Sequence, residues 1–333
     1  MVPDLEHLSW GSKFYLLGGA YLQSFIHFKQ LKSLSVPEIL PLKESNIQIL
    51  SSIASLRSLS FLIDLSGVSA PALPPHAFQG LTALALYGHS DHLVSFILAC
   101  EFSNLERVSF RIVQPPTAGQ PRHLWTALGQ RFNPTLLTSI EAHYNCAFSA
   151  RPSSLMEFFE PLLAFPNITI FDLAFFSMEP SIRDNDLARF GAAWPRLATF
   201  KIEHSKRYSQ PDVARPTLPG VIELARRCPA LTALYIPEID PSPVPEKSTT
   251  PALGHRLRSV WIDSIAPPAT IQVSMDIAAV VDRVFPWIDL EDPQNLSRLV
   301  PGKVWVEVLR LIRVMRIGRE NGMAYTDVRR RGS

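Results

Sequence analysis

One short phrase recurs along this chain of 333 residues and limits the folds that the chain can adopt. It reads FPNITIFDL from Phe165, WPRLATFKI from Trp194 and CPALTALYI from Cys228. Proline is always second, and apolar residues are always fourth, seventh and ninth. Self-similarity at a regular interval predicts a structural unit that is built several times over.

The last six residues of the phrase follow the pattern Leu-x-x-Leu-x-Leu, with other apolar residues allowed, through nine repeats. Successive repeats begin 24 to 34 residues apart, which leaves room for one strand, one turn and one helix in each. The fourth and sixth residues lie on the same side of a strand, because side chains alternate along it. The sequence therefore predicts an α/β fold, an irregular leucine-rich-repeat solenoid with a parallel concave sheet and helices on the convex side. The repeats begin at Leu31, Leu56, Leu81, Leu105, Leu137, Ile168, Leu197, Leu231 and Leu257.

Amphipathic segments between these strands predict the helices. Residues 91–100 are one example, with apolar side chains at positions i, i+3, i+4 and i+7. The proline of the phrase ends such a helix, because it cannot extend the helix and favours extended backbone in the residue before it. A doubly wound α/β domain would also alternate strands and helices. It would have fewer and longer apolar strands and usually a glycine-rich first turn, so we prefer the solenoid.

The sequence divides into four parts. We expect residues 1–30 to begin the solenoid or to form a partial cap, and residues 31–266 to hold the repeats. Residues 267–322 contain two helical patterns and are expected to form a C-terminal helical cap. The basic segment 323–333 is expected to be a disordered tail. Within the repeats, residues 237–254 are rich in proline and polar residues, which predicts a flexible loop.

The repeats lack the asparagine ladder that common leucine-rich repeats have. In those proteins, Asn or Cys three residues after the sixth position hydrogen-bonds the backbone of the turn. We therefore expect the turns to be satisfied in another way. In six repeats that place holds Asp64, His89, Val113, Phe176, Ser205 and Ile239.

The irregular strands, the FP and CP lead-ins and the segment VWVEVLRLIRVMR from Val304 resemble the leucine-rich region of F-box proteins of mushroom-forming fungi. LSSIASLRSLSFL from Leu50 and FQGLTALAL from Phe78 are especially similar to that group. The resemblance covers residues 25–322. It implies repeats that hold the substrate of a cullin ubiquitin ligase, while an F-box docks on a Skp-type linker. No F-box motif is visible in residues 1–30, so we expect the Skp-type contact only if an F-box lies upstream.

Charge and cysteine content restrict the cellular role. The chain has 32 basic and 30 acidic residues, so no global field attracts nucleic acid or an anionic membrane. Three widely spaced cysteines argue against a disulfide framework and for a reducing compartment. No secretory signal and no apolar run of spanning length is visible. We expect an intracellular protein, cytoplasmic or nuclear, that binds neither nucleic acid nor membrane.

Motifs of catalysis and metal binding are missing. The sequence has no phosphate loop, no Gly-x-Ser-x-Gly elbow, no His-Glu-x-x-His and no dinucleotide fingerprint. His89 with His92 and His143 with Cys146 have a metal-like separation, but neither pair has a second pair at a matching distance. We expect no enzyme, no cofactor and no metal site.

Three further polar or reactive residues have structural explanations. Cys228 holds the place of bulky apolar residues in other repeats, which predicts a core residue and not a nucleophile. Asp184 and Asp186 lie at the start of a predicted helix, where carboxylates are favoured by the exposed backbone donors. Capping is sufficient to explain the pair.

The third, fifth and seventh residues of each repeat are expected to line the concave face. They are mostly small and neutral in the first three repeats, whereas charged and aromatic residues concentrate later. Aromatic and arginine side chains supply most interface energy, so we expect a protein partner to anchor near Tyr235 and Trp261. Alternatively, the face is merely solvated, or Trp261 packs under the loop 237–254. The predicted partner-binding residues are Arg107, Arg111, Glu141, His143, Asp172, Lys201, Glu203, Tyr235, Trp261 and Asp263.

Together these features predict a non-catalytic protein–protein interaction solenoid. Its most specific form is the substrate-recognition region of an F-box-like ubiquitin ligase adaptor, with a ligase substrate as the partner. The alternative is a stand-alone leucine-rich-repeat scaffold without a ubiquitin connection, and an enzyme ranks third.

Overall fold

The computed structural model forms two compact units, each built from parallel strands and helices. The N-terminal unit comprises Met1–Ser181 and His204–Val213, and the C-terminal unit comprises Ile182–Glu203 and Ala214–Ser333. The structure describes residues 4–9, 19–36, 40–68, 71–74, 76–114, 122–145, 154–204, 213–246, 250, 252–265, 270–291 and 304–331.

The strands of the N-terminal unit form one parallel sheet in which each main strand pairs with the next in the sequence. The short β3 (Pro41–Leu42) pairs instead with the end of β4. Sequential parallel pairing requires a crossover after every strand, as the repeat predicts. The main strands are, in order, β1 (His7–Ser9), β2 (Ser33–Ser35), β4 (Ser58–Ile63), β5 (Ala83–His89), β6 (Arg107–Gln114), β7 (Ser139–Tyr144) and β8 (Ile170–Phe175).

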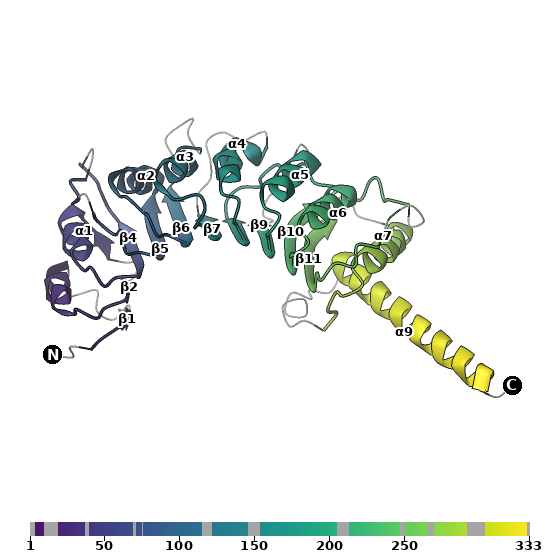
Figure 1. The fold of residues 1–333 in the computed structure, drawn as a ribbon. Coiled ribbons are helices and arrows are strands. Elements are labelled where there is room, and N and C mark those ends of the chain that lie inside the picture. Colours follow the sequence, from purple (N-terminus) through teal and green to yellow (C-terminus); the bar gives the residue numbers. More distant parts are fainter. Residues whose placement is uncertain are drawn as a thin grey trace. The chain divides into compact units, whose positions relative to one another are not determined.

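The helices of this unit provide the other half of its core. Figure 1 shows α2, α3 and α4 on one side of β5 to β8. Trp125 of α3 is fully buried, lies 5.7 Å from the ring of Phe110 and donates a 3.1 Å hydrogen bond to the Tyr144 hydroxyl. The helical segments are η2 (Gly19–His27), α1 (Glu44–Ser51), α2 (Ser90–Ala99), α3 (His123–Arg131), α4 (Met156–Phe159) and η3 (Glu160–Ala164).

The C-terminal unit repeats this arrangement. Strand β10 pairs in parallel with β9 on one side and with β11 on the other. Figure 1 shows α5 and α6 side by side along one side of these strands. The elements are α5 (Asp184–Ala193), β9 (Thr199–His204), α6 (Leu218–Arg227), β10 (Ala233–Ile239), β11 (Ser259–Ile265), α7 (Ile271–Val284) and α9 (Val304–Arg331).

The proline of the repeated phrase ends the helices as predicted. Helix α6 ends at Arg227, and Cys228 then accepts a 3.0 Å hydrogen bond from the amide of Leu231. Helix α5 ends at Ala193, and the Trp194 carbonyl accepts from Leu197 in the same way, at 3.0 Å. The phrase therefore forms a tight turn between helix and strand.

The turns that precede successive strands, at the end of each strand opposite to the missing asparagine, are joined by a backbone ladder. The Arg57 carbonyl accepts from the amides of Thr82 at 2.8 Å and Ala83 at 3.0 Å. The Ala198 carbonyl accepts from Thr232 at 2.8 Å and from the residue after it at 3.1 Å. Threonine hydroxyls strengthen these rungs, since Thr82 Oγ1 also donates to Arg57 and Thr232 Oγ1 to Ala198. Other backbone carbonyls accept hydrogen bonds from two successive amides in the same way: those of Glu6, Lys32, Thr82, Glu106, Thr138 and Thr232.

Helices α7 and α9 cover the end of the C-terminal sheet, where the sequence predicts a helical cap. Trp305 of α9 is fully buried, and its indole Nε1 donates to the Val260 carbonyl of β11 at 3.1 Å. Helix α9 then extends away from the strands of this unit (Figure 1). The backbone of residues 323–331 continues this helix, although their composition predicts a disordered tail.

The expected loop at residues 237–254 is partly regular structure. Strand β10 continues to Ile239, and Glu238 is buried because Arg215 Nε donates to its carboxylate at 2.5 Å. Thr250 is also buried, and its carbonyl accepts from Arg283 of α7 at 2.8 Å. Paired polar groups therefore allow a proline-rich, polar segment to pack, which composition did not indicate. Residues 247–249 and 251 of the expected loop lie outside the described residues.

Gly191 allows α5 and α6 to pack closely, and its replacement tests this contact. A Cβ at Gly191 would lie 2.9 Å from Cβ of Arg227, an atom whose position the α6 backbone sets. We expect Gly191→Ala to destabilise the protein by about 1–2 kcal/mol, although alanine favours helices. Gly318→Ala in α9 is the matched control, because the added Cβ would have nothing within 4 Å apart from the adjacent residues and backbone of its own helix. It should stabilise slightly in urea unfolding; equal midpoints for the two variants would contradict the close packing.

Candidate protein-binding surface

Side chains on the outward side of β5 to β8 form two rows across the N-terminal sheet. Strand register places Tyr87 beside Arg111 and Arg111 beside His143. One pleat earlier, Glu141 lies beside Asp172. Neighbouring strands are separated by about 4.8 Å, so residues in one row are within side-chain reach of each other. All five are half-buried.

Aromatic rings flank the charged residues of these rows. The Arg111 guanidinium carbon lies 5.2 Å from the centre of the Tyr87 ring, a cation–π geometry. The His143 ring meets Phe176 edge to face at 6.2 Å. Phe176 directly follows β8 and is 53% exposed, so this ring presents apolar area to solvent. We name the set of Tyr87, Arg111, Glu141, His143, Asp172 and Phe176 the strand-face cluster.

The chemistry of the strand-face cluster suits recognition of a protein surface. Adjacent carboxylates, such as those of Glu141 and Asp172, repel each other, and a cationic group placed near them would relieve this cost. Arg111 can donate in a planar fork to an acceptor while its ring contact with Tyr87 restricts its orientation. Aromatic and arginine side chains dominate interface energies.

Four of the predicted residues of this unit belong to the strand-face cluster. Arg107, the fifth, is exposed at the start of β6, beside Ala83 and Ser139 and one pleat away from the two carboxylates. It lies at the margin of the surface. The outward residues of β4, Ser58, Ser60 and Leu62, carry no charge.

The prediction that Tyr235 and Trp261 are exposed anchors is wrong. Register places Lys201, Tyr235 and Trp261 in one outward row of the C-terminal sheet, but Tyr235 is 4% and Trp261 2% exposed. The Tyr235 hydroxyl shares a 2.9 Å hydrogen bond with Ser259 Oγ, so its polar end is satisfied within the protein. Strands β10 and β11 are buried on both faces over most of their length, whereas strand alternation identifies only a side of the sheet.

The remaining predicted residues of the C-terminal unit stay half-buried. Lys201 and Glu203 form an ion pair of 3.5 Å along β9, and Asp263 lies near the end of β11. The two aromatic rings of this row, Tyr235 and Trp261, are buried, so its aromatic area is not exposed as that of Phe176 is.

Two residues of the strand-face cluster were not among the predicted sites. Tyr87 is the seventh residue of its repeat, a position that the sequence analysis already assigned to the outward face. Phe176 holds the place of the missing asparagine, and an aromatic residue where a turn needs a polar side chain is a signal that could have revealed it.

The metal-like histidine pairs have other surroundings. His89 and His92 stack with ring centres 5.2 Å apart, and His92 Nδ1 accepts from the Leu65 amide at 3.4 Å. Cys146, the proposed companion of His143, lies outside the described residues. Within the described ranges no group of three or more His, Cys, Asp and Glu side chains is arranged to hold a metal ion.

Cys228 and Asp186 have the structural roles predicted for them, whereas Asp184 contacts α6 and does not cap α5. Cys228 is fully buried, its Sγ donates to the Trp194 carbonyl at 3.4 Å, and burial raises the pKa of its thiol to about 12. Asp186 accepts from the Arg183 amide at 2.9 Å and caps α5. Asp184 instead accepts from the Thr217 amide at 2.7 Å, so it links the start of α5 to the start of α6.

Comparison with models of known protein families gives no match, and comparison with curated proteins gives none either. Among the helices in the described part of the chain, none combines the length and the apolar character needed to cross a lipid bilayer.

Proposed function

We propose that the protein is a non-catalytic leucine-rich-repeat solenoid that binds a protein partner through the strand-face cluster. Two features support the repeat assignment: strands that pair with their sequence neighbours, and the backbone ladder between successive turns. Such repeats place the outward residues of adjacent strands in rows, which suits the recognition of an extended protein surface.

The observation that carries the proposal is the composition of the strand-face cluster. Arginine, tyrosine, histidine and phenylalanine lie together with two carboxylates, and Phe176 remains 53% exposed. An exposed aromatic ring in the same cluster as an oriented guanidinium is typical of interface anchors. Charged neighbours of both signs would then select the partner and set its orientation.

We further propose that the partner is the substrate of a cullin ubiquitin ligase and that this chain supplies the recognition region of an F-box-like adaptor. The support is the sequence resemblance of residues 25–322 to leucine-rich regions of fungal F-box proteins. A scaffold without a ubiquitin connection would use the same surface, so the two versions differ in the additional proteins that are bound.

The test is a comparison of captured proteins between two double variants. We expect Arg111→Glu with Phe176→Ala to reduce capture of specific proteins more than tenfold, since two anchors are lost at about 1–2 kcal/mol each. Arg131→Glu with Leu98→Ala is the matched control, because both residues are exposed on the helical side of the same unit. Quantitative mass spectrometry after proximity labelling provides the measurement.

The possible outcomes distinguish the adaptor from the scaffold, and both from a protein that does not bind through the strand-face cluster. Loss of the same proteins from both double variants, or from neither, would contradict binding through the strand-face cluster. A Skp-type linker retained by all forms would support the adaptor. Its absence, together with a partner that depends on the strand-face cluster, would favour the scaffold.

A further inference from the structure

The turns that precede the strands of the C-terminal unit form a second surface. The Ala198 carbonyl accepts from Thr232, the Thr232 carbonyl from Arg258, and the Arg258 carbonyl from Asp289, at 2.8, 2.9 and 2.8 Å. This chain of hydrogen bonds places four successive turns side by side, although no strand of the described residues follows the fourth. The side chains that immediately precede these hydrogen-bonded residues therefore line one edge of the unit.

An arginine-rich row with an exposed tryptophan lies along this edge. Each turn has an exposed residue two positions before its hydrogen-bonded residue (198, 232, 258 or 289). These exposed residues are Arg196, Ala230, Arg256 and Trp287. At about 4.8 Å between neighbouring turns, the row spans roughly 15 Å. Trp287 is 65% exposed, although tryptophan is a side chain that proteins usually bury in large part. An aromatic ring exposed to this extent is a frequent feature of binding sites.

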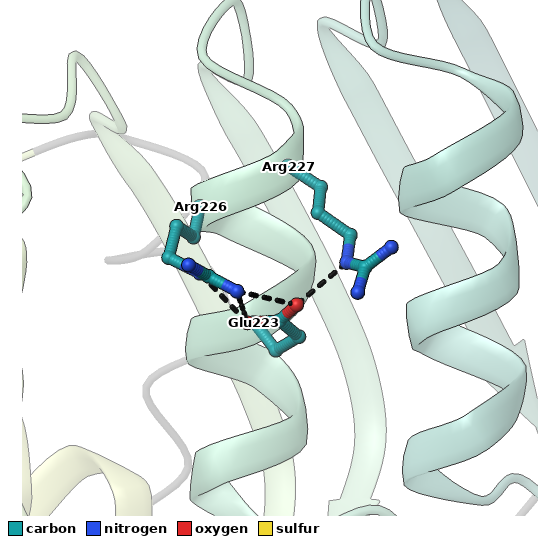
Figure 2. Close-up of polar contacts among 3 residues, drawn as sticks. All are labelled: Glu223, Arg226 and Arg227. Atoms are coloured by element: carbon teal, nitrogen blue, oxygen red, sulfur yellow. Dashed lines mark hydrogen bonds and ion pairs between the residues drawn. The ribbon is translucent and has the colours of Figure 1, made fainter.

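The last residues of α6, which lead directly into the turn that carries Ala230, are two ordered arginines. Figure 2 shows Arg226 and Arg227 converging on Glu223 one turn earlier in the helix. Arg226 Nε donates to Glu223 at 2.8 Å, and Arg227 Nε donates to it at 2.6 Å. One carboxylate balances only one of the two positive charges, and both arginines remain substantially exposed, at 61% and 41%. Glu223 therefore holds these arginines in place without neutralising both.

The described carboxylates near this edge, those of Glu223, Asp289 and Glu291, are fewer than its five arginines. Asp289 lies at the end of the ladder, and Glu291 pairs with Arg313 of α9 at 3.4 Å. Arginines at a helix C-terminus are also favoured by the helix dipole, which explains part of the enrichment. The dipole does not explain Arg196, Arg256 and Arg258, which lie in the turns, or the exposed Trp287. We name the set of Arg196, Arg226, Arg227, Arg256, Arg258 and Trp287 the arginine edge.

We propose that the arginine edge binds an acidic protein segment that carries an apolar side chain for Trp287. Guanidinium groups pair with carboxylates through two parallel hydrogen bonds, so several arginines select a segment with several Asp or Glu residues. Because Glu223 already orders Arg226 and Arg227, less side-chain entropy is lost on binding. This surface is separate from the strand-face cluster and would give the chain a second binding site.

The pattern favours an acidic protein over a single-stranded nucleic acid. Proteins that follow single strands stack successive bases on several aromatic side chains. The row presents one ring, at its end, and its other exposed members are arginines and an alanine. One apolar contact with several carboxylate contacts therefore matches the edge better.

The test uses a fluorescein-labelled polyglutamate peptide with one central leucine, measured by fluorescence anisotropy at low ionic strength on the full chain. We expect Arg256→Glu with Arg258→Glu to weaken binding at least about tenfold and Trp287→Ala to weaken it several-fold. Arg183→Glu with Arg310→Glu changes the net charge equally at exposed positions outside the edge and should leave binding unchanged. Thermal unfolding checks that the exposed substitutions preserve the fold.

Two results would overturn the proposal. One is equal binding of the peptide by the wild-type protein and by the Arg256→Glu, Arg258→Glu variant. The other is tighter binding of an oligothymidylate than of the peptide, lost in the same variants, which would assign the edge to nucleic acid. Arg111→Glu with Phe176→Ala should bind the peptide normally, so failure here is distinguishable from failure of the strand-face proposal.

Discussion

Replacing Trp305 by alanine should destabilise the C-terminal unit by about 3–5 kcal/mol, because a fully buried indole would leave a cavity under β11. The substitution also removes the hydrogen bond from Nε1 to the Val260 carbonyl on the outer edge of that strand. An edge carbonyl without this donor must be hydrated or remain unsatisfied. We therefore expect the end of the sheet to open first.

The measurements are urea unfolding and hydrogen exchange of the β11 amides. Trp305→Phe keeps most of the packing and loses the hydrogen bond, so it should cost about 1–2 kcal/mol. Trp287→Ala is the matched control, since it removes an indole that is 65% exposed and should change stability by less than about 0.5 kcal/mol. Unchanged exchange of β11 in Trp305→Ala would show that α9 does not protect the sheet.

Replacing Asp282 by alanine should cost about 2–4 kcal/mol by breaking the ion-pair contact between α7 and α9. Asp282 accepts from Arg316 Nε at 2.9 Å and from Arg319 Nη1 at 2.6 Å, and its side chain is almost fully buried. Removing the carboxylate leaves Arg316 partly buried without its counter-ion, whereas Arg319 can reach solvent. Asp276→Ala, an exposed change on the same helix, is the control and should be nearly neutral.

The same contact should depend on pH. Burial raises the pKa of the Asp282 carboxyl, but hydrogen bonds from Arg319 and Arg316 outweigh burial and lower it below its ordinary value of 3.8. A carboxyl with a depressed pKa in the folded state contributes stability above the unfolded value and loses it as pH falls through the folded value. The difference in free energy of unfolding between wild type and Asp282→Asn should therefore be largest above pH 3.8 and become smaller as the pH falls below it. A gap that widens on acidification would contradict this ion-pair assignment.

Much of the local structure follows from the apolar pattern. Leu59 and Phe61 are buried in β4, and Leu84 and Leu86 in β5, at the fourth and sixth positions of their repeats. Proline ends α6 where the phrase predicts. These features depend on alternation and backbone conformation over a few residues, which are properties of the sequence itself.

Element boundaries were less predictable where polar residues find partners. Glu238 extends β10 into an expected loop because Arg215, distant in sequence, pairs with it. Composition records how polar a segment is, but not whether its polar groups meet a partner in the folded chain.

The candidate sites likewise combine features set by local sequence with features set by the tertiary structure. Strand alternation alone assigns Arg111, Glu141, His143 and Asp172 to the outward side of the N-terminal sheet. The sequence also determined the repeat, the positions of its turns and the apolar residues of its core, since each depends on local spacing. Only tertiary structure buried Tyr235 and Trp261, brought the Phe176 ring to His143 and placed the turns of the arginine edge side by side. Exposure and proximity depend on segments that are distant in the chain, and no local pattern encodes which segment covers a residue and which leaves it open to solvent.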